Sequence, residues 1–494
     1  MPDRYDVVII GGGVVGCFLA RYLSRYALQI LLIEKEADIG MGASSANSGI
    51  IHPGHDPIPG TLKATMNLAA NPMWDQIAAE LQIPFERRGC YVVGVGPKEV
   101  PILESMLERG RNNGVPGIAI ISAEKMRRDE PKINPEVSAA LWMPTGAIVD
   151  PFAATVAAAE NAVQNGVTVL LETEFEDFLM DGRRIIGVKT NRGEFESRWV
   201  VNAAGLYADE VMHKAHVRPD FKVTPRKGEY CVFDQAEVNI QTVLFPVPSE
   251  ASKGILVLKT MHGNTMMGPN SNPCDDKEDR SVTAEGIAEI WKGAAKLVPG
   301  LNMSGVIAGF AGLRASGNAP CRQAAISYGH DFIIEIAEEV KGLVNIGGIE
   351  SPGLTAAPAI ALRVIELLKD AGESLQEKPQ WNPLRPARPH FRNLSREEQI
   401  RLIQKDPRYG RVICRCEMVT EGEIVAEIHA PIPALTYDAI KRRTWLGTGR
   451  CLGSFDVPRV VAILARERGI SQLEVTKKGE ASRFLVRETK AVEV

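Results

Sequence analysis

The chain has no apolar run long enough to span a bilayer and no dense stretch of basic residues. A membrane-crossing helix needs about 20 predominantly apolar residues, so we expect no transmembrane segment. The formal net charge of -4 gives no electrostatic reason to expect nucleic acid as a partner. A strand is predicted from Tyr5 to Ile10, and this early start leaves no room for a signal peptide. We therefore expect a cytoplasmic protein, peripheral at a membrane only through a partner.

Cysteine is also scarce, with 8 among 494 residues. Five cysteines are scattered singly, at Cys17, Cys90, Cys231, Cys274 and Cys321. This distribution is typical of isolated thiols in a reducing compartment and argues against a disulfide framework. The other three, Cys414, Cys416 and Cys451, lie near the C-terminus. Because thiolates are the usual ligands of iron–sulfur clusters, this group indicates a metal site.

The length is too great for one core and predicts two or three domains. We predict the α/β and α+β classes: a Rossmann-like domain, an inserted antiparallel-sheet substrate domain and a small helical C-terminal module of iron–sulfur type. Apolar strands that end in small residues indicate the first domain, alternating patterns the second, and a proline-rich link the boundary of the third. The predicted ranges are 1–85, 146–220 and 326–372 for the nucleotide domain, 86–145 and 221–325 for the substrate domain, 373–408 for the linker and 409–494 for the module.

A glycine-rich turn between the first strand and the first helix predicts a dinucleotide site. Gly11, Gly13 and Gly16 form the G-x-G-x-x-G pattern, which lets a pyrophosphate approach backbone amides at a helix N-terminus. Glu34 ends the second strand, where a carboxylate can accept hydrogen bonds from both ribose hydroxyls. FAD and NAD both fit this pattern.

Three further segments favour FAD: 42–52, 202–209 and 348–355. They resemble the D-amino-acid-oxidase-like FAD-dependent oxidoreductases, and the chain is most similar to the branch of glycerol-3-phosphate dehydrogenase and L-2-hydroxyglutarate oxidase. Segments 225–230, 260–264 and 311–314 extend this resemblance over nearly the whole length. The cofactor-binding residues that it implies, with the glycine turn, are Gly11, Gly13, Gly16, Glu34, Ala43, Ser44, Asn47, Ser48, Phe175, Ala203, Gly205, Gly348, Gly353, Leu354 and Thr355.

Oxidation of a carbinol by flavin needs a base for the hydroxyl proton and a cation for an anionic substrate tail. His52 directly follows the flavin loop and is the first choice as base, although it can equally be a packing residue. His262 is the alternative base. Arg314 ends a segment where the family places a guanidinium beside substrate, and a guanidinium binds carboxylate or phosphate equally well. Four residues of the presumed substrate sheet can supplement it: Arg226, Lys227, Tyr230 and Lys259.

The substrate remains open at this point. Ala315 follows Arg314 without the proline common in glycerol-3-phosphate dehydrogenases, whereas segment 59–64 resembles the hydroxyglutarate enzymes. Fusion to the C-terminal module favours a dehydrogenase of glycerol 3-phosphate or a similar small anionic carbinol. The alternatives are a 2-hydroxy acid dehydrogenase or oxidase, an amino-acid oxidase, and a non-catalytic electron-transfer subunit of a hetero-oligomer.

The C-terminal module resembles the bacterioferritin-associated-ferredoxin-like domain in all but one ligand. Cys414, Cys416 and Cys451 match, but Asp456 stands where relatives carry the fourth cysteine. A carboxylate is a harder ligand, so a two-iron two-sulfur cluster held here would be more labile or shifted in potential. Three outcomes stay open: a cluster that passes electrons to a partner subunit or quinone, another metal site, or a module that has lost its metal.

Overall fold

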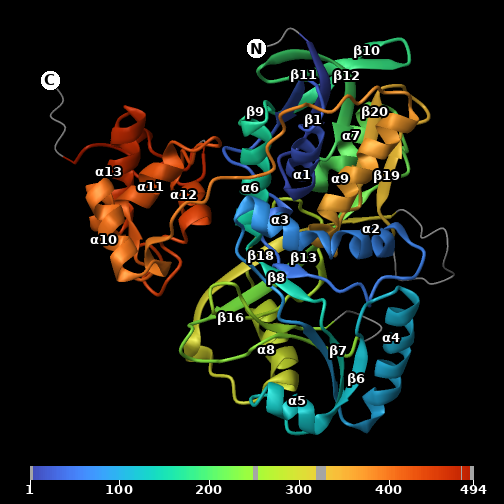
Figure 1. Cartoon of the computed structure of the whole chain (residues 1–494), viewed down its shortest axis with the longest axis vertical. Coiled ribbons are helices and arrows are strands. Elements are labelled where there is room, and N and C mark those ends of the chain that lie inside the picture. The colour runs from blue at the N-terminus through green and yellow to red at the C-terminus, as the bar shows by residue number, and fades with distance from the viewer. Residues whose placement is uncertain (1–3, 249–253, 319–329, 480, 490–494) are drawn as a thin grey trace.

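A computed structural model describes residues 4–248, 254–318, 330–479 and 481–489. Figure 1 shows a sheet with its helices at the top, a second sheet below it and a small helical module at the side. The predicted fold class is therefore confirmed. Cys321 and parts of the predicted ranges 221–325 and 326–372 lie outside the described residues.

The upper sheet has eight strands, and its centre is parallel. Strand β1 (Arg4–Ile10) pairs with β2 (Ile30–Ile33) on one side and β12 (Gly193–Asn202) on the other. Strand β2 is apolar and buried throughout, and β1 and β12 are apolar and buried over 7–10 and 199–201, as expected for the centre of a sheet that is covered on both faces. The remaining strands are β9 (Thr168–Leu170), β10 (Phe175–Asp181), β11 (Arg184–Thr190), β19 (Ile333–Ile336) and β20 (Leu343–Gly347).

Helices cover this sheet and form the largest core of the chain. The first helix, α1 (Val14–Leu23), packs between α6 (Pro151–Gln164) and α9 (Gly353–Asp370). Nine of the ten side chains of α1 are buried, so it is held by packing rather than by solvent-exposed ion pairs. The neighbouring helices are α2 (Leu62–Ala70), α3 (Met73–Leu81) and α7 (Ala208–Lys214).

The lower sheet has nine mostly antiparallel strands. Its longest pair joins β13 (Val223–Phe233) to β18 (Val306–Gly317). The other strands are β5 (Cys90–Val95), β6 (Ala119–Ser122), β7 (Val137–Met143), β14 (Val243–Pro246), β15 (Val257–Lys259), β16 (Thr265–Met267) and β17 (Asn272–Pro273). Its helices are α4 (Val100–Asn112), α5 (Ala123–Asp129) and α8 (Ala284–Leu297). A small sheet of β3 (Ile50–Ile51), β4 (Phe85–Glu86) and β8 (Ala147–Val149) lies between the two large sheets.

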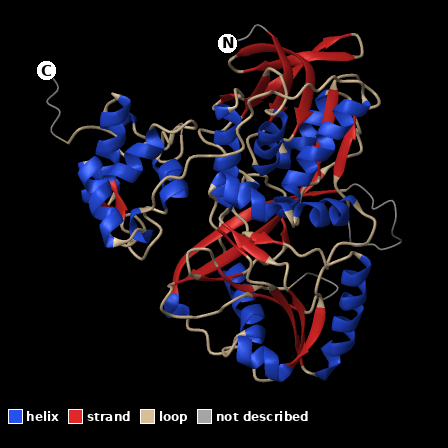
Figure 2. Cartoon of the chain, in the orientation of Figure 1, coloured by secondary structure: helices blue, strands red, loops and turns tan. Residues whose placement is uncertain are grey.

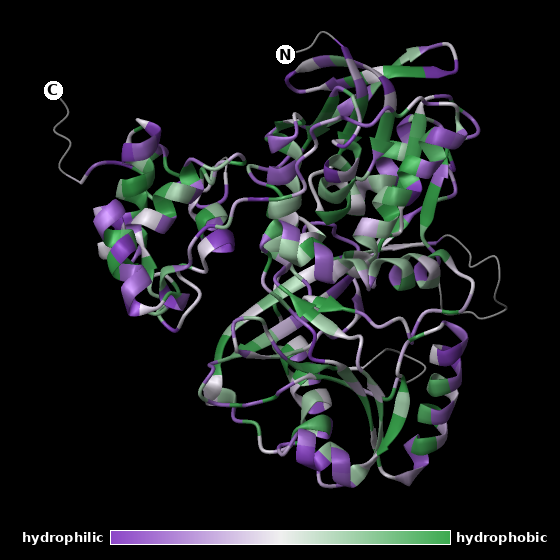
Figure 3. Ribbon diagram, viewed as in Figure 1, coloured by the Kyte–Doolittle hydropathy of each residue, from purple (hydrophilic) through white to green (hydrophobic). Residues whose placement is uncertain are grey.

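The C-terminal module has its own apolar core. It consists of a two-stranded sheet and four helices. Figure 2 shows that most of the module is helical. These are α10 (Arg396–Lys405), β21 (Val412–Cys414), β22 (Val419–Thr420), α11 (Glu421–Ile428), α12 (Tyr437–Thr444) and α13 (Val457–Arg468). After α13 an isolated antiparallel bridge joins Thr476 to Arg483. Figure 3 shows the green apolar faces of these helices turned toward one another.

Buried ion pairs join the module to the body of the chain. Arg443 donates both terminal nitrogens to Asp38, at 2.7 Å each, and both side chains are almost fully buried. Arg388, in the preceding link, bridges Glu160 of α6 and Glu427 of α11 at 2.6 Å each. A third contact, between Arg450 and Asp234, is more exposed.

No helix in the described part of the chain has the length and apolarity required to cross a membrane. The longest apolar helix, α9, is 18 residues long, and its apolar face packs against α1 and α2.

Candidate functional site

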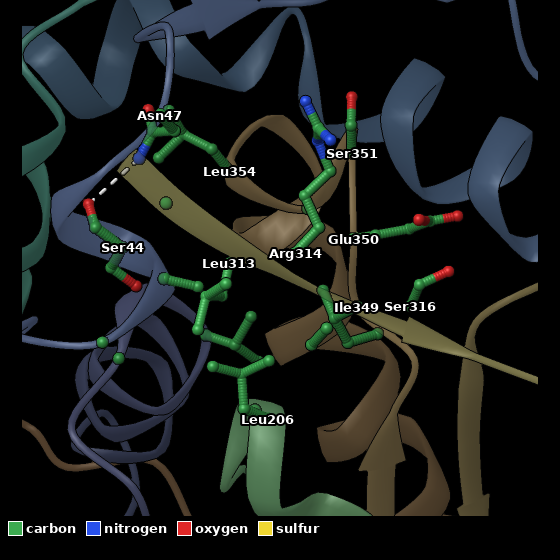
Figure 4. A pocket seen from close by; sticks show the side chains of 18 of the residues that line it. Ser44, Asn47, Leu206, Leu313, Arg314, Ser316, Ile349, Glu350, Ser351 and Leu354 are labelled. Carbon is green, nitrogen blue, oxygen red and sulfur yellow. Dashed lines mark hydrogen bonds between the residues drawn. The ribbon is translucent and has the colours of Figure 1, made fainter. Parts of the chain in front are cut away.

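A cavity of about 1010 Å³ runs from the glycine turn of β1 to the lower sheet. Figure 4 shows side chains from both domains around it, including Ser44, Asn47, Leu313, Arg314 and Leu354. A cavity of this size, with both apolar and polar walls, is large enough for a dinucleotide cofactor and a small substrate.

The glycine turn brings backbone amides to one end of the cavity. A side chain at Gly16 would put its Cβ 2.0 Å from the Gly11 carbonyl oxygen, so only glycine permits this turn. Helix α1 begins after Gly13 with no side-chain cap from that residue and no acidic residue in its first turn. The positive end of the helix faces the cavity without an acidic side chain to offset it, which suits an anion such as pyrophosphate.

Besides the predicted contact with ribose hydroxyls, Glu34 makes hydrogen bonds within the protein. Its carboxylate accepts hydrogen bonds from the amides of Gly12, at 2.7 Å, and Glu36, at 3.0 Å. Burial raises the pKa of Glu34 above its usual value, and these two amides oppose that shift. The carboxylate thus fixes the glycine turn while it also lines the cavity.

The polar loop after β2 closes over the start of α1. Ser44 accepts a hydrogen bond from the Val14 amide at 2.9 Å. Asn47 donates to the Ser44 carbonyl at 3.0 Å and accepts from the Gly49 amide at 2.8 Å; the former bond is dashed in Figure 4. These contacts hold the loop in one shape against the cavity.

Most of the predicted cofactor residues line the cavity: Gly11, Gly13, Glu34, Ala43, Ser44, Asn47, Ser48, Phe175, Ala203, Gly205, Gly353 and Leu354. The other three, Gly16, Gly348 and Thr355, lie behind its wall. The Thr355 hydroxyl accepts from the His52 amide at 2.9 Å and donates to the Ile50 carbonyl. Thr355 thus positions the segment that carries His52.

His52 lines the cavity beside the start of α9. Its Nε2 lies 3.4 Å from the Ser351 hydroxyl, and its ring packs 5.9 Å from the ring of Phe245. The His52 carbonyl accepts hydrogen bonds from Asn67 and Asn71, which anchors its backbone. The imidazole is held in the wall of the cavity, beside residues of both domains.

Arg314 and Arg226 form a cationic pair in the wall of the cavity. They face each other across the β13–β18 pair, and both line the cavity. The Ser271 hydroxyl accepts from both, at 3.2 Å from Arg314 and 3.1 Å from Arg226. Arg314 also donates to the Asn270 carbonyl at 3.0 Å. Within the described residues neither guanidinium has a carboxylate partner, so their charges are left for a ligand.

His262 lies away from the cavity, at the contact with the C-terminal module. Its Nε2 is 3.2 Å from the Asp150 carboxylate, which also accepts a hydrogen bond from the Trp445 indole at 3.0 Å. The rings of His262 and Trp445 are 3.7 Å apart. The loop position of His262 in the sequence did not reveal this role in joining two domains.

The residues predicted to supplement Arg314 differ in whether they line the cavity. Tyr230 lines the cavity and stacks on Phe310, with ring centres 4.6 Å apart. Lys227 instead pairs with Asp279 at 2.8 Å, and Lys259 does not line the cavity. One lining pair was missed: Lys63 and Glu350, which form an ion pair at 2.5 Å. Its members are 287 residues apart, so no local pattern indicates it.

The three clustered thiols and Asp456 form two neighbouring pairs. Cys416 lies beside Cys451, and Cys414 lies beside Asp456. The sulfurs of Cys416 and Cys451 lie 3.7 Å apart. Burial raises the pKa of Cys414 to about 11, hydrogen bonding with Asp456 adds to that shift, and the amides of Gly447 and Glu417 oppose it. Across the described chain no three His, Cys, Asp or Glu side chains converge as a ready-made metal site.

Asp456 has spare ligand capacity. One carboxylate oxygen accepts from the Tyr437 hydroxyl at 3.0 Å, while the other is buried without a hydrogen-bond partner. Such an orphaned buried oxygen is costly unless something binds it. Two pairs of donors agree in number with the four protein ligands of a two-iron cluster, and the amides at Cys414 suit an anionic group. The residues present therefore fit a cluster.

Comparison with known proteins agrees with both sites. Residues 6–367 match the family described as FAD dependent oxidoreductase. Residues 412–466 match the BFD-like [2Fe-2S] binding domain.

One relative matches the chain over its full length, and others match about three quarters of it. A glycerol 3-phosphate dehydrogenase of Caloramator mitchellensis is 43% identical and covers 99% of both chains. A glycerol 3-phosphate oxidase of Mycoplasma genitalium is 34% identical over 76% of this chain and 97% of its own. The structure of the L-alpha-glycerophosphate oxidase of Mycoplasma pneumoniae with FAD bound superposes with a TM-score of 0.72 at 33% identity. It covers 78% of this chain and 100% of its own. The chain therefore belongs to the FAD dependent oxidoreductase family and carries a BFD-like module at its C-terminal end.

Proposed function

We propose that this chain is an FAD-dependent dehydrogenase of glycerol 3-phosphate. The observation that carries the proposal is the pair Arg226 and Arg314, two guanidiniums that share the Ser271 hydroxyl inside the cofactor cavity. Like charges directly opposite each other in a sheet destabilise it. A bound dianion relieves this repulsion and accepts several charge-assisted hydrogen bonds.

The charge of the anion separates the candidate substrates. A phosphate monoester carries close to two negative charges at neutral pH, which matches two cations without a carboxylate partner. Each carboxylate of a 2-hydroxy acid or amino acid carries one, and the two charges of 2-hydroxyglutarate lie at opposite ends of the molecule, whereas Arg226 and Arg314 converge on one hydroxyl. The names of the similar dehydrogenase and oxidases support the same choice.

His52 is proposed to take the proton of the substrate hydroxyl. A bound FAD would supply the acceptor for the hydride that leaves the carbinol carbon. The imidazole lies in the same cavity as the arginine pair, and its backbone is anchored by Thr355, Asn67 and Asn71. A base held in one position near its proton typically contributes a factor of about 10² to 10⁴ in rate. Phe245 and Tyr230 line the same cavity and give it aromatic walls.

Electrons are proposed to leave through the C-terminal module. A two-iron cluster held by Cys414, Cys416, Cys451 and Asp456 would supply one-electron transfer to a partner protein or quinone. The similar oxidase from Mycoplasma genitalium aligns with only 76% of this chain, and the module occupies the C-terminal remainder. An enzyme that hands electrons to oxygen directly has no need of a relay, so the module favours a dehydrogenase.

Anaerobic reduction of the purified holoprotein tests the substrate. Glycerol 3-phosphate, glycerol, L-2-hydroxyglutarate and L-proline are added separately while the flavin absorbance is followed. We expect rapid bleaching by glycerol 3-phosphate alone. Faster bleaching by hydroxyglutarate or proline would overturn the phosphate assignment. Hydrogen peroxide formed in air at the rate of substrate turnover would show an oxidase instead.

A further inference from the structure

The rim of the cysteine site exposes three large apolar side chains. Met418 is 43% exposed, Leu452 58% and Phe455 80%. All three belong to the two loops that carry Cys416 and Cys451. These loops touch, because the two sulfurs are 3.7 Å apart. The module thus places an apolar surface around its thiols instead of covering them.

The backbone holds two of these side chains in an unfavourable conformation. Met418 has a φ of 54° and Leu452 a φ of 47°, in the left-handed region that non-glycine residues seldom adopt. Neither residue gains burial in return, since both are exposed. Strain without a stabilising contact is a feature of functional surfaces.

The margin of this apolar surface is cationic. Arg415 lies between Cys414 and Cys416, and Arg459 lies in the first turn of α13; both are exposed. Neither forms an ion pair with any part of the chain that the structure describes. The nearby carboxylates carry little free charge, because Glu417 pairs with Arg392 and Asp456 is buried.

We propose that the surface formed by Arg415, Met418, Leu452, Phe455 and Arg459 docks an acidic electron-carrier protein. The inference rests on the proposed function, in which the cysteine site is the electron outlet. A carrier whose redox group is ringed by carboxylates would be steered by the arginines and seated on the apolar centre. The surface is small, which suits the weak, short-lived contact of a redox encounter.

Electron balance sets the stoichiometry of this contact. Oxidation of one carbinol to a ketone releases two electrons and two protons. Two oxidised one-electron carriers would therefore dock in turn, each leaving reduced by one electron, while both protons pass to solvent.

Two c-type cytochromes of opposite surface charge provide the probes. The full-length holoprotein is mixed with glycerol 3-phosphate and either an acidic or a basic cytochrome c, and haem reduction is followed. The variants are Phe455→Glu and Arg415→Glu. Met303→Glu is the matched control, because Met303 is a similarly exposed apolar residue of the lower domain at 49%. Iron and flavin contents are measured for each protein.

We expect the acidic cytochrome to be reduced about tenfold faster than the basic one at low salt, with the advantage lost at high salt. Both module variants should lower that rate about tenfold, while Met303→Glu and the reduction of a small neutral quinone stay unchanged. Equal rates with the two cytochromes, or variants without effect, would overturn the proposal. Binding of the wild type but not Phe455→Glu to phosphatidylglycerol vesicles, without cytochrome preference, would assign the surface to a membrane.

Failure of the proposed function gives a different result. If glycerol 3-phosphate does not bleach the flavin, or iron is absent, the substrate or relay assignment fails. Calorimetric binding of the oxidised acidic cytochrome still measures the surface. Loss of that binding in Phe455→Glu, with retention in Met303→Glu, supports the docking site, and no binding by the wild type rejects it.

Discussion

The Asp38 carboxylate receives both terminal nitrogens of Arg443, and this pair ties the C-terminal module to the nucleotide-binding domain. Asp38 lies shortly after β2, which ends at Ile33, and residues 34–36 between them line the cavity, so the module docks beside it. Burial by itself would raise the pKa of Asp38, but the guanidiniums of Arg443 and Arg442 outweigh burial and hold the pKa below its usual value. The carboxylate is therefore charged at neutral pH.

Asp38→Asn is expected to loosen the module. Arg443 would stay buried with only Glu427, 3.7 Å away, as an ionic partner. Breaking one side of a buried pair typically costs about 3–5 kcal/mol. We expect faster proteolytic cleavage within 373–408 and a lower melting temperature. The control is Asp438→Asn, whose partner Lys477 is half exposed, so that loss should cost less than about 1 kcal/mol. Equal protease resistance of both variants and the wild type would contradict this role.

The same pair predicts a dependence of stability on pH. Since the folded-state pKa of Asp38 is depressed, its contribution is fully present above the unfolded value of about 3.9 and falls as the pH drops through the lower folded value. The difference in unfolding free energy between wild type and Asp38→Asn should thus be constant from about pH 5 to about pH 7, where the carboxylate is charged in both the folded and the unfolded state. It should shrink below about pH 4. Denaturant melts at several pH values provide the measurement; a difference that grows on acidification would refute the assignment.

Arg314→Met and Arg226→Met are each expected to raise the KM for glycerol 3-phosphate. A hydrogen-bonded ion pair that loses one partner typically loses about 2–5 kcal/mol, or 30-fold or more in kcat/KM. Arg314→Lys should recover only part of this, since lysine lacks the planar fork. Steady-state kinetics with a quinone acceptor are the measurement. Lys227→Met is the control, because Lys227 on the same strand pairs with Asp279 outside the cavity. A normal KM in both arginine variants would mean that the anion binds elsewhere.

His52→Gln should slow flavin reduction about 10²–10⁴-fold, with little change in FAD content. Stopped-flow mixing under anaerobic conditions separates this step from later electron transfer. His429→Gln is the comparison, since His429 is exposed and pairs with Glu467 in the module. If the two variants reduce at the same rate as the wild type, His52 packs against the cavity without taking the proton.

Local sequence patterns predicted the elements of the fold well. The strand predicted from Tyr5 to Ile10, the helix after the glycine turn and the second strand before Glu34 all form. These features depend on residues within one turn or strand, where backbone sterics and an apolar stripe decide the conformation.

Contacts between residues far apart in the sequence could not be predicted from local patterns. Arg226 and Arg314 face each other because β13 and β18 pair in one register over ten residue pairs, from Val223 to Val232, and no local pattern sets that register. His262 was a candidate base because histidine suits proton transfer. Its actual partners, Asp150 and Trp445, come from two other domains. A residue's chemistry can be named from its type, but its neighbours depend on the folded chain.

Asp456 gives the sharpest test of the cysteine site. Asp456→Ala removes the buried oxygen that has no hydrogen-bond partner and should lower the iron retained after anaerobic purification. Asp456→Cys restores four thiolates, which bind iron more firmly than a carboxylate does. We therefore expect iron content to rise in the order Ala, Asp, Cys, with a changed electron paramagnetic resonance signal in the cysteine variant. Ser454→Ala, in the same loop, should match the wild type. Equal iron in Asp456→Ala and the wild type would show that the carboxylate only accepts the Tyr437 hydrogen bond, and absence of iron from all four proteins would leave the module a structural domain.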